Sequence, residues 1–171
     1  MSKVMVIGAG PAGIMAAITA AENHNVVLVD GNEKIAKKLF ITGKGRCNIT
    51  NGKDIGDFFD YIPGNPHFLY SALYSFTNND VIEMIESEGT KLKIERGGRI
   101  FPESDKSSDI IKALSKKLSK AKVDIKLNSK VTDVFFENNT IKSVEINNSQ
   151  KISADYFIIA TGGASYPLTG S

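Results

Sequence analysis

Three glycines near the N-terminus have the spacing of a phosphate-binding loop. Gly8, Gly10 and Gly13 follow the pattern G-x-G-x-x-G, with Pro11 and Ala12 before the last of them. In such a loop the first glycine permits a tight turn, and the second leaves room for a pyrophosphate against the backbone. The third lets the following helix close on the strand, and the first turn of that helix offers N–H groups to an anion. The spacing therefore predicts a site for the phosphates of a dinucleotide.

An acid follows at the separation expected for recognition of a ribose. Asp30 lies 22 positions after Gly8, at the end of the apolar run 26–29. A carboxylate there accepts hydrogen bonds from the hydroxyls of the adenosine ribose. It also repels a 2′-phosphate, so FAD or NAD fits this site and NADP does not. The alternative is a plain βαβ turn with no nucleotide, because glycines also mark ordinary turns.

The apolar pattern indicates which elements position these residues. Residues 4–7 and 26–29 are short apolar runs typical of buried parallel strands, and residues 14–22 between them are rich in helix formers. Asn32 is suited to cap a helix over 33–40. Further helices are expected at 66–74, at 79–88, and from Ser104 or Ser107 to about 120, and further strands at 91–95, 99–101 and 123–127.

The middle of the chain contains two further segments of distinctive composition. Residues 41–52 combine glycines, cations and small polar side chains, which suits either a solvated connector or a loop lying against the cofactor. Their position directly after the ribose acid favours contact with the cofactor. The aromatic side chains between 54 and 79 are expected to be core residues. They are Phe58, Phe59, Phe68, Tyr70, Tyr74 and Phe76.

The last third of the chain predicts a β-meander. Strand-like runs at 130–136, 141–146 and 151–153 are separated by asparagine-rich pairs that tolerate hairpin turns. A buried strand at 156–159 then returns to the sheet, and the small residues of 160–163 follow it. The predicted fold is α/β, with a parallel sheet and a three-stranded meander where a plain NAD-binding domain has a crossover helix.

Composition limits the classes of function. The 171 residues are 42% hydrophobic and 23% charged, as in an ordinary globular protein, and the net charge of +2 is too small to indicate nucleic-acid binding. The single cysteine, Cys47, allows no internal disulfide, and the two histidines, His24 and His67, form no pattern of metal ligands. Because the longest apolar runs are too short to span a membrane, we expect a cytoplasmic protein without membrane contact.

Three stretches outside the glycine loop make the prediction of fold and cofactor more specific. They are K-K-L followed by T-G-K-G-R-C-N-I-T-N within 37–51, G-R-I-F-P-E-S at 98–104, and A-T-G-G-A-S-Y-P at 160–167. Together with the meander, they resemble the bacterial NAD(P)/FAD-dependent oxidoreductases of the aminoacetone oxidase (BaiN-like) family. The resemblance covers the whole chain and implies a glutathione-reductase-like FAD-binding fold. Proteins of that family are longer, so residues 1–171 are expected to be the N-terminal portion of one FAD-binding domain.

The resemblance also implies a set of cofactor-binding residues. Asp30 replaces the more frequent glutamate on the ribose, the loop at 42–48 runs along the riboflavin half, and Val131 meets the adenine through its backbone. The complete set is Gly8, Gly10, Pro11, Ala12, Gly13, Asp30, Thr42, Gly43, Arg46, Cys47, Asn48, Val131, Ala160, Thr161 and Gly162.

The function expected from these features is an FAD-dependent oxidoreductase acting on a small molecule. NADH or NADPH is a possible transient reductant, and no residue is identified as a catalytic acid or base. Cys47 is expected to be a packing or flavin-contact residue, because a dithiol reductase needs a second cysteine and none is present. The alternatives are an NAD-dependent dehydrogenase, a non-catalytic nucleotide-binding module and a flavin-dependent RNA-modifying enzyme. The substrate and the oligomeric state are not encoded in any pattern that we can identify.

Overall fold

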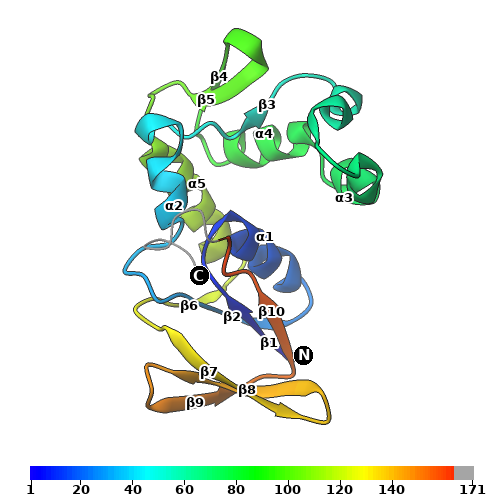
Figure 1. Ribbon diagram of the computed structural model, residues 1–171. Helices are drawn as coiled ribbons and strands as arrows, with labels where there is room; N and C mark the ends of the chain where they lie inside the picture. Colours follow the sequence, from blue (N-terminus) through cyan, green and yellow to red (C-terminus); the bar gives the residue numbers. More distant parts are fainter. Residues whose placement is uncertain (164–171) are drawn as a thin grey trace. The chain divides into compact units, whose positions relative to one another are not determined.

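The chain folds into two compact units. A computed structural model describes residues 1–163. The sheet unit consists of Met1–Leu39 and the chain from Leu114 onward, and the inserted unit is Phe40–Ala113 (Figure 1). The inserted unit thus interrupts the sheet unit in sequence. The assignment of the whole chain to a single FAD-binding domain stays a prediction.

A parallel four-stranded sheet forms the centre of the sheet unit. Its strands are β1 (Lys3–Ile7), β2 (Asn25–Val29), β6 (Asp124–Lys126) and β10 (Tyr156–Ile159), in the order β10-β1-β2-β6. Ile7 is in register with both Val29 and Ile159, so β1, β2 and β10 end together. The residues that follow these strands therefore meet at one edge of the sheet. The parallel sheet confirms the predicted fold class.

The two faces of this sheet are covered by different elements. Helix α1 (Pro11–Ala20) lies on one face, and the meander lies on the other (Figure 1). The meander consists of β7 (Val131–Glu137), β8 (Thr140–Ile146) and β9 (Gln150–Ser153), all antiparallel. Met5 and Ile7 of β1 pack in one buried cluster with Val144 and Ile146 of β8. Because side chains alternate along a strand, Val4 and Val6 of β1 point to the opposite face.

The meander confirms the prediction made from its asparagine-rich turns. Asn138, Asn139, Asn147 and Asn148 all have positive φ, as tight hairpins between β7, β8 and β9 require.

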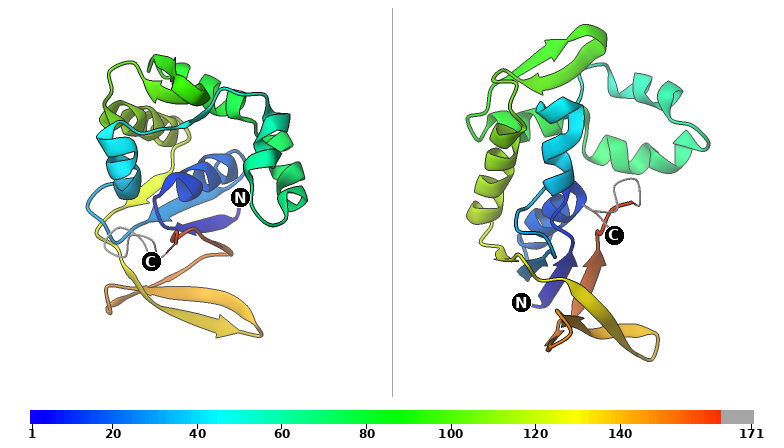
Figure 2. Two further views of the ribbon diagram at one scale, coloured as in Figure 1. Left: turned by 45° about the horizontal axis from the view of Figure 1, so that its top comes forward. Right: turned by 60° about the vertical axis from the view of Figure 1, so that its left-hand side comes forward.

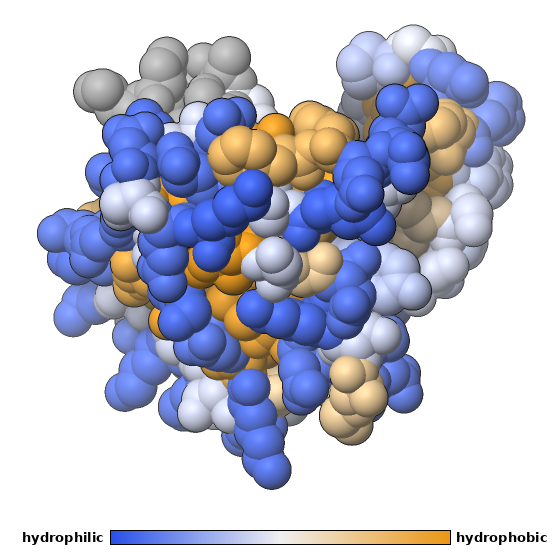
Figure 3. Space-filling model, turned by 90° about the horizontal axis from the view of Figure 1, so that it is seen from below, coloured by the Kyte–Doolittle hydropathy of each residue, from blue (hydrophilic) through white to orange (hydrophobic). Residues whose placement is uncertain are grey.

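On the face of the molecule seen from below, hydrophilic side chains predominate and apolar ones show between them (Figure 3).

The inserted unit combines a small antiparallel sheet with short helices (Figure 2). The sheet has the order β3-β5-β4, formed by Thr50–Asn51, Arg99–Pro102 and Leu92–Glu95. The longer helices are α4 (Asn78–Glu86), which Thr77 and Asp80 cap reciprocally, and α5 (Ser107–Lys120), which extends into the sheet unit. The remaining elements are α2 (Lys37–Ile41), α3 (Tyr70–Ser75) and the 3₁₀ segments η1 (Thr42–Gly45), η2 (Ile55–Tyr61), η3 (Pro66–Leu69) and η4 (Arg96–Gly98).

Two predictions about local structure are wrong. The helix expected over 33–40 begins only at Lys37, because Ala36 has a φ of 54° and Asn32 uses its side chain on Asp30 instead of capping a helix. The aromatic residues between 54 and 79 are not core residues. Phe68 is 82% exposed, and Tyr70 and Tyr74 stack with Phe59 at the surface of the inserted unit. Aromatic side chains can thus gain contact area from one another without entering a core.

Candidate functional site

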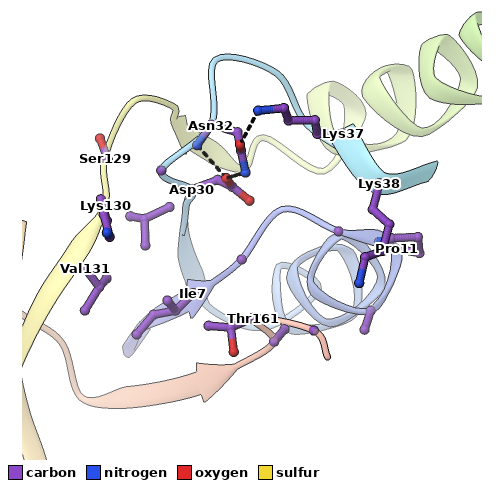
Figure 4. A pocket seen from close by; sticks show the side chains of 17 residues that line it. Ile7, Pro11, Asp30, Asn32, Lys37, Lys38, Ser129, Lys130, Val131 and Thr161 are labelled. Carbon is purple, nitrogen blue, oxygen red and sulfur yellow. Dashed lines mark hydrogen bonds between the residues drawn. The ribbon is translucent and has the colours of Figure 1, made fainter. Parts of the chain in front are cut away.

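A cavity of about 450 Å³ opens at the carboxyl edge of the parallel sheet. This volume is within the usual range for small-molecule sites, and the edge is where ligands bind in open α/β sheets. Figure 4 shows the side chains that line it. The lining residues are Ile7, Gly8, Gly10, Pro11, Ala12, Val29, Asp30, Gly31, Asn32, Lys37, Lys38, Ser129, Lys130, Val131, Ala160, Thr161 and Gly162.

The three glycines of the loop have different surroundings. A Cβ at Gly13 would collide with the carbonyl oxygen of Gly8, and a Cβ at Gly8 would collide with that of Ala160. These two glycines are therefore required by the packing of the protein itself. A Cβ at Gly10 would meet no protein atom within 4 Å, and Gly10 lines the cavity. Among the three glycines of the loop, Gly10 alone leaves space open to a ligand.

The first turn of α1 is suited to bind an anion. Gly10 is its N-cap and Pro11 follows at the first helical position, and no side chain caps the exposed N–H groups. The first turn also contains no acidic residue. The N–H groups and the positive end of the helix dipole thus remain at the cavity wall without an acidic side chain from the same turn. Together with the space at Gly10, this arrangement fits the diphosphate of a dinucleotide.

Protein hydrogen bonds hold Asp30 beside the glycine loop (Figure 4). Its Oδ2 accepts from the Ala9 N–H at 2.6 Å, and its Oδ1 accepts from the backbone and side-chain nitrogens of Asn32 at 2.7 and 2.8 Å. The carbonyl oxygen of Ala9 in turn accepts from the Ala36 N–H at 2.8 Å. Since a carboxylate offers about four lone-pair sites, Asp30 retains capacity for a ribose hydroxyl while it restrains the glycine loop.

The structure brings nine of the predicted cofactor residues to this cavity. They are Gly8, Gly10, Pro11, Ala12, Asp30, Val131, Ala160, Thr161 and Gly162. Gly13 packs beneath the loop. Val131 reaches the site because the Ser129 N–H donates to the Asp30 carbonyl oxygen at 2.8 Å, which places the start of β7 beside the end of β2. Binding of a cofactor by these residues stays a prediction.

Sequence reasoning missed several polar lining residues. Asn32, Lys37, Lys38, Ser129 and Lys130 all line the cavity, although none was assigned to the site. The positive charges of Lys37 and Lys38 complement the dipole at the C-terminal end of the helix expected at 33–40. The sequence therefore explained these two lysines without a ligand. Their proximity to the ribose acid in sequence was the available signal.

The loop at 42–48 lies in the inserted unit and has an unusual backbone. Its residues are not among those lining the cavity, and their expected role beside the flavin stays a prediction. Gly43, Lys44, Gly45 and Cys47 all have positive φ. At Gly43 a Cβ would be 3.0 Å from the Asn48 backbone nitrogen. The glycines at 43 and 45 are therefore explained in part by the turn itself.

Arg46 forms an ionic network within the inserted unit. Its guanidinium is 2.9 Å from a Glu95 oxygen and 3.2 Å from an Asp105 oxygen, and it lies 4.2 Å from the centre of the Phe101 ring. Hydrogen bonding to Glu95 raises the pKa of Arg46. Lys93 also bonds Asp105 at 2.7 Å, which is the main reason that the pKa of Asp105 is lowered. These contacts fix the position of Arg46 independently of a cofactor.

Cys47 is a buried thiol. Its side chain is fully buried, and this burial raises its pKa. Neighbouring cations such as Lys44 and Arg46 would favour a thiolate, but desolvation is the larger influence on the pKa of this thiol. The geometry therefore agrees with a packing residue.

The described part of the chain contains neither a cluster of metal ligands nor a membrane-spanning helix. Among residues 1–163, no three His, Cys, Asp or Glu side chains gather closely enough to hold a metal ion. None of the helices in the same range is long and apolar enough to cross a membrane. Residues 164–167, the end of the A-T-G-G-A-S-Y-P stretch, lie outside the described range.

Sequence comparisons identify relatives across the whole chain. The sequence pattern of the HI0933-like protein Rossmann domain matches residues 2–171. A 3-dehydro-bile acid delta(4,6)-reductase from Clostridium scindens is 33% identical over 175 residues, and a ribosomal RNA dihydrouridine synthase from Escherichia coli is 32% identical over 169. These alignments cover 100% and 98% of the chain but only 41% of each relative.

Solved structures share the fold at low sequence identity. THI4 of Thermovibrio ammonificans matches with a TM-score of 0.63 and 16% identity, over 94% of this chain and 57% of that one. The open conformation of a flavocytochrome c3 fumarate reductase matches with a TM-score of 0.62 and 22% identity, over 95% of this chain and 34% of that one. At these identities the likeness shows the fold alone.

Proposed function

The chain belongs to the HI0933-like Rossmann-domain family, and from this premise we propose that the whole protein is an FAD-dependent oxidoreductase whose cofactor occupies the cavity at the carboxyl edge of the sheet. The observation that carries the proposal is the set of three features meeting there. Gly10 leaves space, the first turn of α1 presents its N–H groups, and hydrogen bonds hold the Asp30 carboxylate beside the glycine loop.

FAD is favoured over NAD by the elements around this site. A meander covers one face of the sheet where a plain NAD-binding domain carries a crossover helix. The strand end at 160–162 adds a second group of small residues to the cavity. The resemblance noted from the sequence associates both features with FAD.

The residues of this chain would bind and orient the cofactor. Asp30 would accept from the adenosine ribose, and the first turn of α1 would stabilise the diphosphate. When bound, the flavin supplies the ability to accept and deliver a hydride, with NADH or NADPH as the proposed reductant. No described residue is assigned as the acid or base of the reaction.

The two named relatives suggest a class of reaction. One is named as a reductase of a bile acid at its delta(4,6) positions, and the other as a synthase of dihydrouridine. Both names denote saturation of a carbon–carbon double bond in a ring. We propose that this protein likewise reduces an activated carbon–carbon double bond of a small molecule.

A nucleobase of RNA is the second candidate substrate. The relatives from Escherichia coli and Haemophilus influenzae are both named as ribosomal RNA dihydrouridine synthases, at 32% and 31% identity. The net charge of +2 gives no independent support, because RNA-binding surfaces are usually strongly basic. We therefore rank a small-molecule substrate first.

Analysis of the cofactor in the purified full-length protein tests the central proposal. We expect a flavin absorbance spectrum and, after denaturation, release of FAD. Recovery of NAD alone, or of FMN, would contradict the proposal. Incubation of the reduced holoprotein with an enone and with unmodified ribosomal RNA would then distinguish the two classes of substrate.

A further inference from the structure

The side chains that line the cavity carry an excess of positive charge. The carboxylate of Asp30 lies in the same lining as the ammonium groups of Lys37, Lys38 and Lys130, which leaves a formal net charge of +2. The diphosphate of a dinucleotide is negatively charged at neutral pH. The lining therefore complements the diphosphate better than it complements the uncharged adenosine or isoalloxazine.

The three lysines occupy different parts of the wall (Figure 4). Lys37 is on the side of the acid, where its Nζ donates to Asn32 Oδ1 at 3.0 Å. Lys130 lies next to Ser129 and Val131 at the start of β7. Both are exposed and lie on the side where the ribose and adenine are expected.

Lys38 differs from the other two in position and burial. Its side chain extends from α2 to lie beside Pro11, the first helical residue of α1 (Figure 4). It is half-buried, and its Nζ donates to the Gly163 carbonyl oxygen at 3.1 Å, just beyond the end of β10. The ammonium group is thus held between the first turn of α1 and the end of β10 before any ligand is present.

Resting on the proposed function, we propose that Lys38 is the side-chain cation that binds the diphosphate of the cofactor. Lys37 and Lys130 serve the adenosine side. The diphosphate in this class of fold is bound at the glycine loop and the helix N-terminus, which is where Lys38 lies. The hydrogen bond to Gly163 holds the Lys38 ammonium in place, so its attraction for the diphosphate adds to that of the helix dipole.

Binding of ADP and adenosine to the full-length apoprotein tests this role without any flavin chemistry. Calorimetry gives the affinity for ADP, and ligand-observed NMR gives that for adenosine. We expect Lys38→Ala to weaken ADP binding at least about tenfold. Adenosine binding should change by less than about twofold. The dependence of ADP affinity on salt concentration should become shallower, because one ion pair is lost.

Matched variants separate charge from structure. Lys38→Arg keeps the charge and should retain most of the ADP affinity, whereas Lys38→Met keeps only the apolar stem and should lose it. Lys34→Ala removes a nearby lysine that is 80% exposed and does not line the cavity, so both affinities should stay unchanged. Lys37→Ala should affect ADP and adenosine to a similar extent.

The outcomes separate this proposal from the one on which it rests. Equal weakening of ADP and adenosine by Lys38→Met, or unchanged ADP affinity, would show that Lys38 does not bind the diphosphate. Failure of the wild-type protein to bind ADP at all would instead contradict the dinucleotide site itself. Circular dichroism of each variant identifies any loss of folding, and Lys38→Met provides the comparison if Lys38→Ala does not fold.

Discussion

At the scale of single residues, Asp30 combines two tasks at the edge of the cavity. Its carboxylate faces the space where a ribose is expected, and it also accepts from the Ala9 N–H within the glycine loop. Asn32 supplies two further hydrogen bonds that fix the orientation of the carboxylate. The protein itself therefore fixes both the carboxylate of Asp30 and the part of the glycine loop bonded to it.

Replacement of Asp30 by alanine should weaken FAD binding by about ten- to a hundredfold, because a charge-assisted hydrogen bond contributes roughly 1.5–3 kcal/mol. The dissociation constant of the full-length protein can be measured by flavin fluorescence. Asn32→Ala is the matched control, since it removes one bond to the carboxylate and leaves the carboxylate in place. An unchanged dissociation constant for Asp30→Ala would show that the acid serves the loop alone.

Replacement of Cys47 by serine tests the assignment of this residue to packing. The thiol is fully buried and its pKa is raised, so it is poorly suited to act as a thiolate nucleophile. We expect the full-length variant to bind FAD and to keep its rate of flavin turnover within about tenfold of wild type, or about 1.4 kcal/mol of barrier. Normal FAD binding with a loss of about a hundredfold or more in turnover would instead identify Cys47 as a catalytic residue.

At the scale of elements, the site depends on how closely α1 approaches β1 and β10. Gly13 allows the helix to contact the Gly8 carbonyl, and Gly8 allows the loop to contact Ala160. The cavity remains open at Gly10, because a Cβ added there would meet no protein atom within 4 Å. Close packing and open cavity space are thus divided between glycines that are only a few residues apart.

Two alanine substitutions should separate these roles. Gly13→Ala places a methyl group against backbone, so we expect the apoprotein to lose about 1–3 kcal/mol of stability, as in other overpacked sites. Gly10→Ala places its methyl group in the cavity, and the φ of −76° suits alanine. This variant should keep the stability of the apoprotein and lose FAD affinity. Chemical denaturation and flavin titration of both variants make the comparison, and a destabilised Gly10→Ala apoprotein would contradict it.

At the scale of the whole molecule, the chain consists of a sheet unit with a cavity at its edge and an inserted unit. It spans about two fifths of the length of the relatives that it matches, 41% in each case. The cavity is formed by residues of the sheet unit alone. We therefore expect binding of the adenosine half and completion of an active site to be separable properties.

Residues 1–171 produced alone should fold but show no oxidoreductase turnover. The parallel sheet has its covering helix and meander, and the buried cluster between β1, β2 and β8 is complete within this range. Cooperative thermal unfolding by circular dichroism would demonstrate folding, and oxidation of NADH in the presence of added FAD would measure turnover. Substantial NADH-dependent reduction of the flavin by residues 1–171 would refute the expectation that these residues lack turnover on their own.

The sequence alone determined the elements whose signals are local. The glycine spacing, the acid at the end of β2 and the asparagine-rich turns of the meander each depend on neighbouring residues, and all appear where they were predicted. The tertiary structure decided which side chains share the cavity. Lys38 and Gly163 are distant in sequence and meet only because β10 pairs with β1. Likewise, the surface position of Phe68 and the ionic contacts of Arg46 depend on folding partners, which hydrophobicity and charge patterns do not specify.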